Sequence, residues 1–318
     1  MGVLRETGHG PKHAPIPPPP HPTYDLDQIV RLALEEDSAG IGDVTTLSTI
    51  PADTQAVASF LAKADGILAG LAVADKVCAA VDPGLEVTWT HKDGDFVVKG
   101  TIFGGVRGAA RSILVAERVA LNFLQRMSGI ATAARAMVAA GHAARILETR
   151  KTVPGLRLLD KWAVLIGGGV NHRIGLYDMV MIKNNHISAA GSVNAAVHRT
   201  LEYTRERGLR VPIEVEARTL QEVHEVLAVL EADPGCIDRI MLDNMTRLDP
   251  TLPDGVDVQM LQSAMDLVKG HTIETEASGN VSIETVRRIA STGVGFISCG
   301  ALTHSVTALD ISLRIHDT

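Results

Sequence analysis

Aromatic residues are scarce in this chain: they make up 3% of its 318 residues. Proteins that stack nucleic-acid bases or sugar rings use aromatic side chains as platforms, so this scarcity argues against both classes. Basic residues are also in the minority, with 30 Lys and Arg against 37 Asp and Glu, and the net charge is −7. A globally basic nucleic-acid-binding protein is therefore not expected.

Cysteine and long apolar segments are equally scarce. Cys78, Cys236 and Cys299 form no CxxC pair and cannot all pair within one chain, which suits a reducing compartment. No run of 18 apolar residues exists, so no transmembrane helix is expected, and the first residues lack the apolar stretch of a secretory signal. They are also too rich in proline for an amphipathic transit peptide. We expect a cytoplasmic protein without membrane contacts, and an organellar location stays open.

Residues 1–23 differ in composition from the remainder. Seven of the fourteen prolines lie between Pro11 and Pro22. Such a segment is typical of polyproline II structure or disorder. We predict a disordered proline-rich tail, and the alternative is a ligand for a proline-binding module.

Folded sequence begins near Tyr24. The spacing of apolar residues predicts a helix over 25–37, and short β-like runs separated by turn dipeptides follow between Val57 and Gly108. Residues 111–140 are rich in Ala, Leu and Val and predict a helix, which we expect to break near Ser128 and Gly129.

Beyond this helix, short apolar runs alternate with helical ones. The runs predicted as strands are 146–149, 179–183, 213–216, 240–243, 272–277 and 296–299, and those predicted as helices are 157–166, 192–207, 219–230, 257–268 and 282–291. Ser192 is a candidate N-cap, and Thr219 with Glu222 has capping-box spacing. This alternation predicts βαβ units around a parallel sheet.

Ionisable residues or small turns follow every one of these strands. The strand ends lead into Arg150-Lys151, Lys183, Glu216, Asp243, Ser278-Gly279-Asn280 and Cys299-Gly300-Ala301. In a (β/α) barrel the active site is built at the carboxyl ends of the strands. Charges repeated at this position therefore predict a functional site.

Positive charge is concentrated between residues 145 and 186, which hold seven Lys and Arg against three acidic residues. A cationic pocket in an acidic protein favours a small anionic ligand. A basic surface helix would explain Arg157 and Lys161, but it explains Arg173 and Lys183 poorly.

The last two turns have no charged side chains, but they offer backbone N–H groups ahead of helices predicted near Ser282 and near Thr303–Ser305. Such turns bind phosphate, and the last strands of barrels commonly carry them. Glu216 and Asp243 end neighbouring strands. Paired carboxylates can act as acid and base or hold a divalent ion and ribose hydroxyls, and the second interpretation suits neighbouring phosphate turns better.

These residues lie in longer motifs that resemble the quinolinate phosphoribosyltransferase family. The matching runs are ERVALNFLQRMSGIAT (117–132), ETRKTVPG (148–155), DKWAVLIGGGVNHRIG (160–175), DMVMIKNNHI (178–187), IEVEA (213–217), MLDNM (241–245), EASGNV (276–281) and SCGALTHS (298–305). The resemblance covers about residues 25–318. It implies an α/β fold: an N-terminal α/β-sandwich domain over 24–127, rejoined by about 306–318, and an incomplete parallel α/β barrel over 128–305.

The resemblance also implies an activity, a cofactor and an assembly. The activity is transfer of phosphoribosyl from phosphoribosyl pyrophosphate to quinolinate with decarboxylation, which yields nicotinate mononucleotide, pyrophosphate and CO₂ in NAD biosynthesis. The implied cofactor is Mg²⁺, held directly or indirectly by Glu216 and Asp243. The implied assembly is a homodimer with shared active sites. A paralogue acting on another acid such as nicotinate, or a non-catalytic phosphate-binding barrel, is the alternative.

Residue by residue, the resemblance places quinolinate on five cationic side chains and the phosphoribosyl donor on the later strand ends. The first set is Arg118, Arg150, Lys151, His172 and Arg173, and the second is Lys183, Glu216, Asp243, Ser278, Gly279, Asn280, Cys299, Gly300 and Ala301, with Thr149 as a further contact. Of these, Lys151, Lys183, Glu216 and Asp243 are the predicted catalytic residues. Arg118 is expected to reach the partner's site, and Arg126 on the same helix is expected to be a surface residue.

Overall fold

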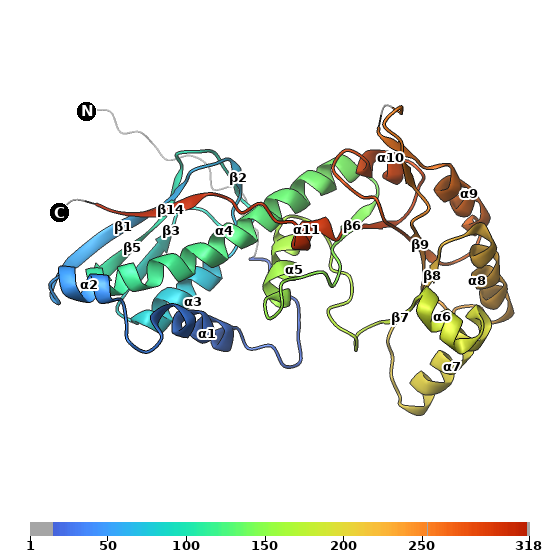
Figure 1. The fold of residues 1–318 in the computed structure, drawn as a ribbon, viewed down its shortest axis with the longest axis horizontal. Helices are drawn as coiled ribbons and strands as arrows, with labels where there is room; N and C mark the ends of the chain where they lie inside the picture. Colours follow the sequence, from blue (N-terminus) through green and yellow to red (C-terminus); the bar gives the residue numbers. More distant parts are fainter. Residues whose placement is uncertain (1–14, 253, 317–318) are drawn as a thin grey trace, which may run out of the picture.

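The computed structural model describes residues 15–252 and 254–316, and one long helix connects its two larger sheets (Figure 1). The first sheet is antiparallel, with the order β14–β1–β5–β3. Its strands are β1 (Gln55–Ala62), β3 (Glu86–Trp89), β5 (Ile102–Ala109) and β14 (Ile311–Ile315). The C-terminal strand β14 pairs with β1, so the end of the chain returns to the N-terminal unit.

Burial alternates along β1 and shows which face of the sheet covers the core of this unit. Ala56, Ala58, Phe60 and Ala62 are buried, whereas the residues between them are more exposed, as expected of a strand with one covered face. Around the sheet lie α1 (Leu26–Ser38), α2 (Val44–Thr49), α3 (Leu71–Val81) and the short pair β2 (Gly66–Ile67) and β4 (Phe96–Val97).

The connecting helix α4 (Ala110–Gly141) is continuous over 32 residues, so the predicted break near Ser128 and Gly129 is wrong. Both residues are buried and serve packing. The hydroxyl of Ser128 accepts from the N–H of Ala69 at 2.9 Å, and a Cβ at Gly129 would collide with the carbonyl oxygen of Thr307. The domain boundary predicted after Met127 falls inside this helix, which belongs to both units.

The second sheet is parallel and has the order β6–β13–β12–β9–β8–β7. Its strands are β6 (Arg145–Leu147), β7 (Val180–Ile182), β8 (Ile213–Ala217), β9 (Arg239–Asp243), β12 (Glu274–Ser278) and β13 (Phe296–Ser298). No pairing joins β6 to β7 within the described residues, which leaves the barrel incomplete. The predicted fold class is thus confirmed, and all six predicted strands are present.

Helices surround this sheet, most of them where the sequence predicts them (Figure 1). They are α5 (Arg157–Ile166), α6 (Asn184–Ala190), α7 (Val193–Glu206), α8 (Leu220–Ala232), α9 (Gln259–Val268), α10 (Val286–Ala290) and α11 (Ala301–His304), and the pair β10 (Arg247–Leu248) and β11 (Val256–Asp257) precedes α9. Ser192 caps α7, and Thr219 with Glu222 forms the predicted capping box of α8. No helix in the described ranges is both long and apolar enough to cross a bilayer.

The predicted disordered tail, residues 1–23, is covered by the described residues only from Pro15 onward. Residues 15–23 form neither helix nor strand, and most of them are exposed, but two points of contact with the fold are present. The indole Nε1 of Trp162 donates to the carbonyl oxygen of Ile16 at 2.8 Å, and Pro19 is buried. The last part of the leader is therefore in contact with α5.

Candidate functional site

A cavity of about 500 Å³ opens at the carboxyl ends of the parallel strands. The residues that line it are Thr149, Arg150, Lys151, His172, Arg173, Met181, Lys183, Glu216, Met241, Asp243, Asn244, Glu276, Ser278 and Ser298. This is the edge at which the sequence predicts the site. Nine of the predicted site residues thus share one cavity.

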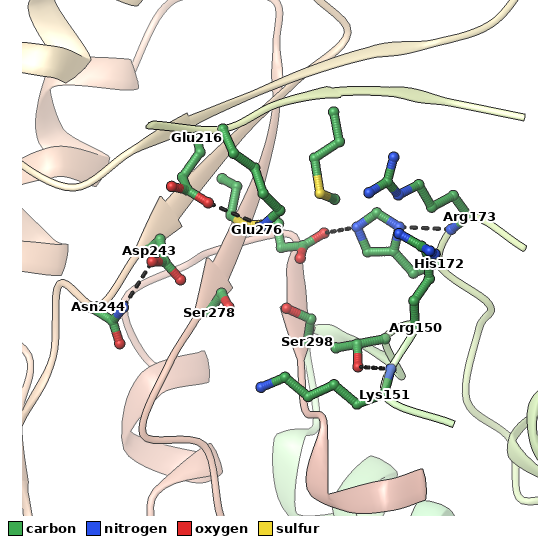
Figure 2. Close-up of a pocket in the computed structure, with 14 residues that line it drawn as sticks. Arg150, Lys151, His172, Arg173, Glu216, Asp243, Asn244, Glu276, Ser278 and Ser298 are labelled. Atoms are coloured by element: carbon green, nitrogen blue, oxygen red, sulfur yellow. Dashed lines mark hydrogen bonds and ion pairs between the residues drawn. The ribbon is translucent and has the colours of Figure 1, made fainter. Parts of the chain in front are cut away.

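Cationic side chains form one side of the cavity, and they come from two loops (Figure 2). Arg150 and Lys151 follow β6, and His172 and Arg173 lie ahead of β7. Burial and the nearby charge of Arg150 lower the pKa of Arg173. The Nε of Arg150 is buried and has no hydrogen-bond partner in the described part of the chain. Such a cluster of cations favours an anionic ligand, because an anion would relieve their mutual repulsion.

The ring of His172 contacts two carboxylates inside the barrel. Its Nε2 lies 3.1 Å from Glu214 and 3.3 Å from Glu276, whose side chains are fully buried. Arg239 lies 3.2 Å from Glu276, so two anions and two potential cations are buried together. Glu214 and Glu276 thereby fix the position of the His172 ring against the cavity.

The charge of His172 follows from two opposing influences. Burial disfavours the imidazolium, but the carboxylates of Glu214 and Glu276 favour it, and the pKa of His172 is raised to about 9. The backbone N–H of Arg173 donates to Nδ1 at 2.6 Å, which favours the neutral ring. A charged ring carries a proton on Nδ1 and could not accept this N–H, so the two carboxylates favour the imidazolium whereas burial and the backbone contact favour the neutral ring.

Glu216 and Asp243 lie opposite this cationic side (Figure 2). One carboxylate oxygen of Glu216 contacts Lys183 Nζ at 3.0 Å, and the other accepts from the N–H of Asn184 at 3.2 Å. Asp243 accepts from the Asn244 amide at 2.7 Å. Burial and the charge of Glu216 raise the pKa of Asp243, as expected where two carboxylates share a site.

The two predicted phosphate turns differ in their position relative to the cavity. Ser278 lines the cavity, whereas Gly279 and Asn280 follow it with positive φ angles of 93° and 56°. Cys299, Gly300 and Ala301 are absent from the cavity lining, and Ser298 occupies that place. Cys299 is buried, and burial raises the pKa of its thiol. The helices that follow also differ from the prediction, because α10 begins at Val286 and α11 spans only four residues.

Gly300 contributes to the site through Lys151. A Cβ at Gly300 would lie 2.9 Å from Cδ of Lys151, so glycine leaves room for this side chain. Thr303 stabilises the same loop, because its hydroxyl donates to the carbonyl oxygen of Lys151 at 2.9 Å. The Cys-Gly-Ala turn therefore supports the cationic side rather than lining the cavity.

Arg118 and Arg126, two of the four arginines of α4, have different surroundings. Arg118 is exposed and does not line the cavity of its own chain. Arg126, expected at the surface, donates to both oxygens of Asp160 at 2.8 Å and to the carbonyl oxygen of Thr303 at 3.0 Å. Arg126 is therefore structural, and the prediction of a surface role is wrong because Asp160 is fully buried and needs a counterion.

Sequence reasoning missed the inward-facing residues below the strand ends. Glu214, Glu276 and Ser298 are not among the predicted site residues, and neither are Met181, Met241 and Asn244. The period of two along a strand was the available signal, since Glu214 stands two residues before Glu216 and Glu276 two before Ser278. Residues so spaced face the same side, which here is the barrel interior.

Two sets of side chains have the donor types that a metal requires. Glu216 and Asp243 line the open cavity and offer carboxylate oxygens, the ligands that Mg²⁺ prefers. His172, Glu214 and Glu276 offer three ligand atoms within 4.8 Å of one another, but they are buried. Arg239 lies 3.2 Å from Glu276, so part of the negative charge of this second set is balanced without an ion.

Comparison with known proteins agrees with this geometry. Two family models match the chain: the N-terminal domain of quinolinate phosphoribosyl transferase over residues 43–128, and its C-terminal domain over residues 130–314. The Nicotiana tabacum protein named quinolinate phosphoribosyltransferase [decarboxylating] 1b is 58% identical over 94% of this chain and 85% of its own length. The Arabidopsis thaliana protein named nicotinate-nucleotide pyrophosphorylase [carboxylating], chloroplastic, is 59% identical over the same shares.

Solved structures give the same result. NadC from Streptococcus pyogenes is 36% identical and superposes with a TM-score of 0.81, covering 92% of this chain and 97% of its own. The nicotinate-nucleotide pyrophosphorylase of Francisella tularensis is 34% identical with a TM-score of 0.80, covering 92% and 96%. The two domain models, the relatives and the shared fold show that this chain belongs to the quinolinate phosphoribosyltransferase family.

Proposed function

We propose that this chain is a decarboxylating phosphoribosyltransferase that converts quinolinate and phosphoribosyl pyrophosphate to nicotinate mononucleotide, pyrophosphate and CO₂. The observation that carries the proposal is the division of one cavity between four basic side chains and two carboxylates. Arg150, Lys151, His172 and Arg173 form the first side, and Glu216 and Asp243 form the second. An enzyme that joins a dicarboxylic acid to a sugar phosphate needs both.

The cationic side suits the two adjacent carboxylates of quinolinate. Planar guanidinium groups match carboxylates with two parallel hydrogen bonds, so Arg150 and Arg173 are the expected anchors. His172 and Lys151 add positive charge. These side chains bring several positive charges close together. An acid with two negative charges would neutralise more of this charge than nicotinate, which has one carboxylate.

The opposite side suits the phosphoribosyl donor. Departure of pyrophosphate leaves positive character at the anomeric carbon, which the negative charges of Glu216 and Asp243 favour. Lys183 would offset phosphate charge, and Ser278 offers a hydroxyl to the same end of the cavity. Glu216 and Asp243 would also hold Mg²⁺, directly or through the ribose hydroxyls, and the ion would supply further charge neutralisation for the leaving pyrophosphate.

No side-chain nucleophile is required by this reaction. The pyridine nitrogen attacks the anomeric carbon while the bond to pyrophosphate breaks, and the ring becomes a pyridinium. The bond to the 2-carboxylate then breaks, CO₂ leaves, the pyridinium accepts the electron pair at C2, and a proton replaces the carboxylate. The protein positions the reactants and neutralises their charges. Cys299, buried with a raised thiol pKa, has no role as a nucleophile.

Arg118 belongs to the proposal through a homodimer. It is exposed on α4 and lies outside the cavity of its own chain. In a twofold dimer, the N-terminal unit of one subunit would bring Arg118 to the cationic side of the partner's cavity. Each site would then be shared by two chains.

Location is proposed on the basis of the relatives. The Arabidopsis thaliana relative is named chloroplastic, and the Nicotiana tabacum relative 2b is named mitochondrial. These names favour an organelle for this chain over the cytoplasm. Fractionation of cells that express a C-terminally tagged full chain tests the assignment.

The activity is tested with the purified protein, quinolinate, phosphoribosyl pyrophosphate and Mg²⁺, with nicotinate mononucleotide as the measured product. We expect turnover that requires the divalent ion and that nicotinate supports poorly. Equal turnover of the two acids would favour a paralogue acting on nicotinate, and binding of phosphoribosyl pyrophosphate without turnover would favour a non-catalytic phosphate-binding barrel.

A further inference from the structure

The proline-rich segment before α1 contacts the fold at three places. The indole Nε1 of Trp162 donates to the carbonyl oxygen of Ile16 at 2.8 Å. The ring of His21 meets that of Tyr177 edge to face, with 5.8 Å between centroids. The hydroxyl of Tyr24 donates to the carbonyl oxygen of Gly155 at 3.0 Å. We call residues 15–24 the strap; in Figure 1 it runs from α1 toward α5.

Two of these contact points lie on the two loops that carry the cations of the cavity. The third lies on the helix between those loops. Gly155 belongs to the loop that follows Arg150 and Lys151. Tyr177 belongs to the loop that follows His172 and Arg173. Trp162 lies on α5, the helix that connects the two loops, and the residue is 5% exposed.

α5 already ties both loops together from within. Arg157 donates to the hydroxyl of Thr152 at 3.1 Å and to the carbonyl oxygen of Ile174 at 3.4 Å, so it bridges one loop to the other. Lys161 donates to the carbonyl oxygen of His172 at 3.1 Å. Through Trp162, the strap thus contacts a helix whose polar side chains join the two loops.

The composition of the strap suits docking on such a surface. A proline-rich segment is extended and stiff before it binds, so it loses little conformational freedom on docking. Its carbonyl groups are unpaired within the segment, and proteins that recognise proline-rich sequences do so on aromatic surfaces. Burial raises the pKa of Tyr24 to about 12, so its hydroxyl remains a hydrogen-bond donor at all pH values of interest.

We propose that the strap is an intramolecular ligand of the surface formed by Trp162, Tyr177 and the Gly155 carbonyl group, and that its docking holds the two cation-bearing loops at the spacing that the acid substrate requires. The strap residues are positioning residues, since none of them lines the cavity. The kinetic part of this proposal rests on the proposed function, whereas the docking itself does not.

Docking is tested by NMR on the full chain labelled with ¹⁵N-tryptophan, because the protein has two tryptophans. Three proteins are compared: the full chain, one lacking residues 2–14, which keeps the strap, and one lacking residues 2–22, which loses most of it. We expect the Trp162 indole N–H to shift and to exchange faster only in the third. Trp89 is the internal control, since its indole donates to Asp75 at 2.8 Å away from the strap. An unchanged Trp162 signal in the third protein would overturn the docking.

Positioning is tested by steady-state kinetics on the same proteins and on Trp162→Phe, which keeps an aromatic ring and removes the N–H donor. We expect KM for quinolinate to rise about three- to tenfold in the chain lacking residues 2–22 and less in Trp162→Phe, as the loss of one or two hydrogen bonds predicts. KM for phosphoribosyl pyrophosphate and kcat should change less than twofold.

Each kinetic outcome has a distinct meaning. Equal rises in both KM values, or a fall in kcat alone, would contradict a role in spacing the acid-binding loops. If the chain lacking residues 2–22 does not fold, Trp162→Phe carries the test by the same criterion. If the unaltered chain does not turn over quinolinate, the proposed function fails, and the indole signals still decide whether the strap docks.

Discussion

Lys161 and Glu148 form an ion pair in which neither side chain is exposed to solvent. Glu148 stands at the end of β6 and Lys161 on α5, and the pair reaches the loop of His172. Glu148 accepts from the N–H of His172 at 3.1 Å and from the amide of Asn171 at 3.0 Å. The pair therefore links the packing of α5 to the placement of a cation in the cavity.

Lys161→Met should destabilise the protein by about 3–5 kcal/mol, because it leaves the carboxylate of Glu148 buried without a counterion. Urea denaturation measures the change. Lys269→Met is the matched control, since Lys269 is exposed beyond α9, and it should have little effect. Adding Glu148→Met to Lys161→Met should recover much of the lost stability, and no recovery would contradict the electrostatic explanation.

Sequence patterns predicted the parallel unit well because each of its elements carries a local signal. The six strands follow from short apolar runs, and the site residues at their ends follow from where those runs stop. For Glu214 and Glu276 the period of two indicates only which face of the strand they share. The role of a buried carboxylate inside an apolar run becomes interpretable only when His172 and Arg239 are known to lie beside it. That proximity depends on the register of separate strands, such as Glu214 opposite Arg239.

Contacts between distant segments account for the predictions that were wrong. Lys161 fits a basic surface helix by sequence, but the fold places Glu148 against it. Arg126 lies 34 residues before Asp160, and no local pattern joins them. The expected break at Gly129 followed the general preference of glycine for helix ends, whereas the fold uses this glycine to bring Thr307 close to α4.

Arg150→Lys should lower kcat/KM for quinolinate although it keeps the charge. Lysine lacks the planar fork, and the loss of one charge-assisted hydrogen bond corresponds to about 1.5–3 kcal/mol, or roughly 10- to 150-fold. Steady-state kinetics with quinolinate varied would show the loss. Arg247→Lys, at a side chain that is 78% exposed and outside the cavity, should behave as the unaltered protein. Unaltered kinetics of Arg150→Lys would remove Arg150 from the quinolinate pocket.

Asp93→Asn should stabilise the protein above about pH 6. Burial raises the pKa of Asp93 from 3.8 to about 6, although its carboxylate accepts from the N–H of Leu71 at 3.1 Å. Between these two values the unfolded chain has released a proton that the folded chain still holds, so the free energy of unfolding falls as pH rises. Asparagine keeps the acceptor and has no charge to bury.

Thermal unfolding of both proteins across the pH range tests this directly. The gain from Asp93→Asn should be absent below about pH 4, grow up to about pH 6 and then stay constant. A gain that is the same at every pH would show that the substitution acts through packing and that ionisation of Asp93 has no part in it.

Arg118 should act on the partner's site. Arg118→Ala and Lys183→Ala are each expected to be inactive, because each removes a cation from every site. After subunit exchange, heterodimers should contain one site with both residues intact, and activity should return to about a quarter of the unaltered level by statistical assortment. Exchange demonstrated by mass spectrometry without recovered activity would place Arg118 in its own subunit's site or outside any site.

The most direct test of the account is the fate of the quinolinate 2-carboxylate. The purified chain is given phosphoribosyl pyrophosphate, Mg²⁺ and quinolinate labelled with ¹⁴C at that carboxyl group. Released CO₂ is measured by its radioactivity, and nicotinate mononucleotide is quantified by chromatography in the same samples. The account predicts that labelled CO₂ and nucleotide appear in equal amounts, and that Arg150→Lys slows both to the same extent. Nucleotide formed without release of the label, or nicotinate consumed as fast as quinolinate, would contradict it.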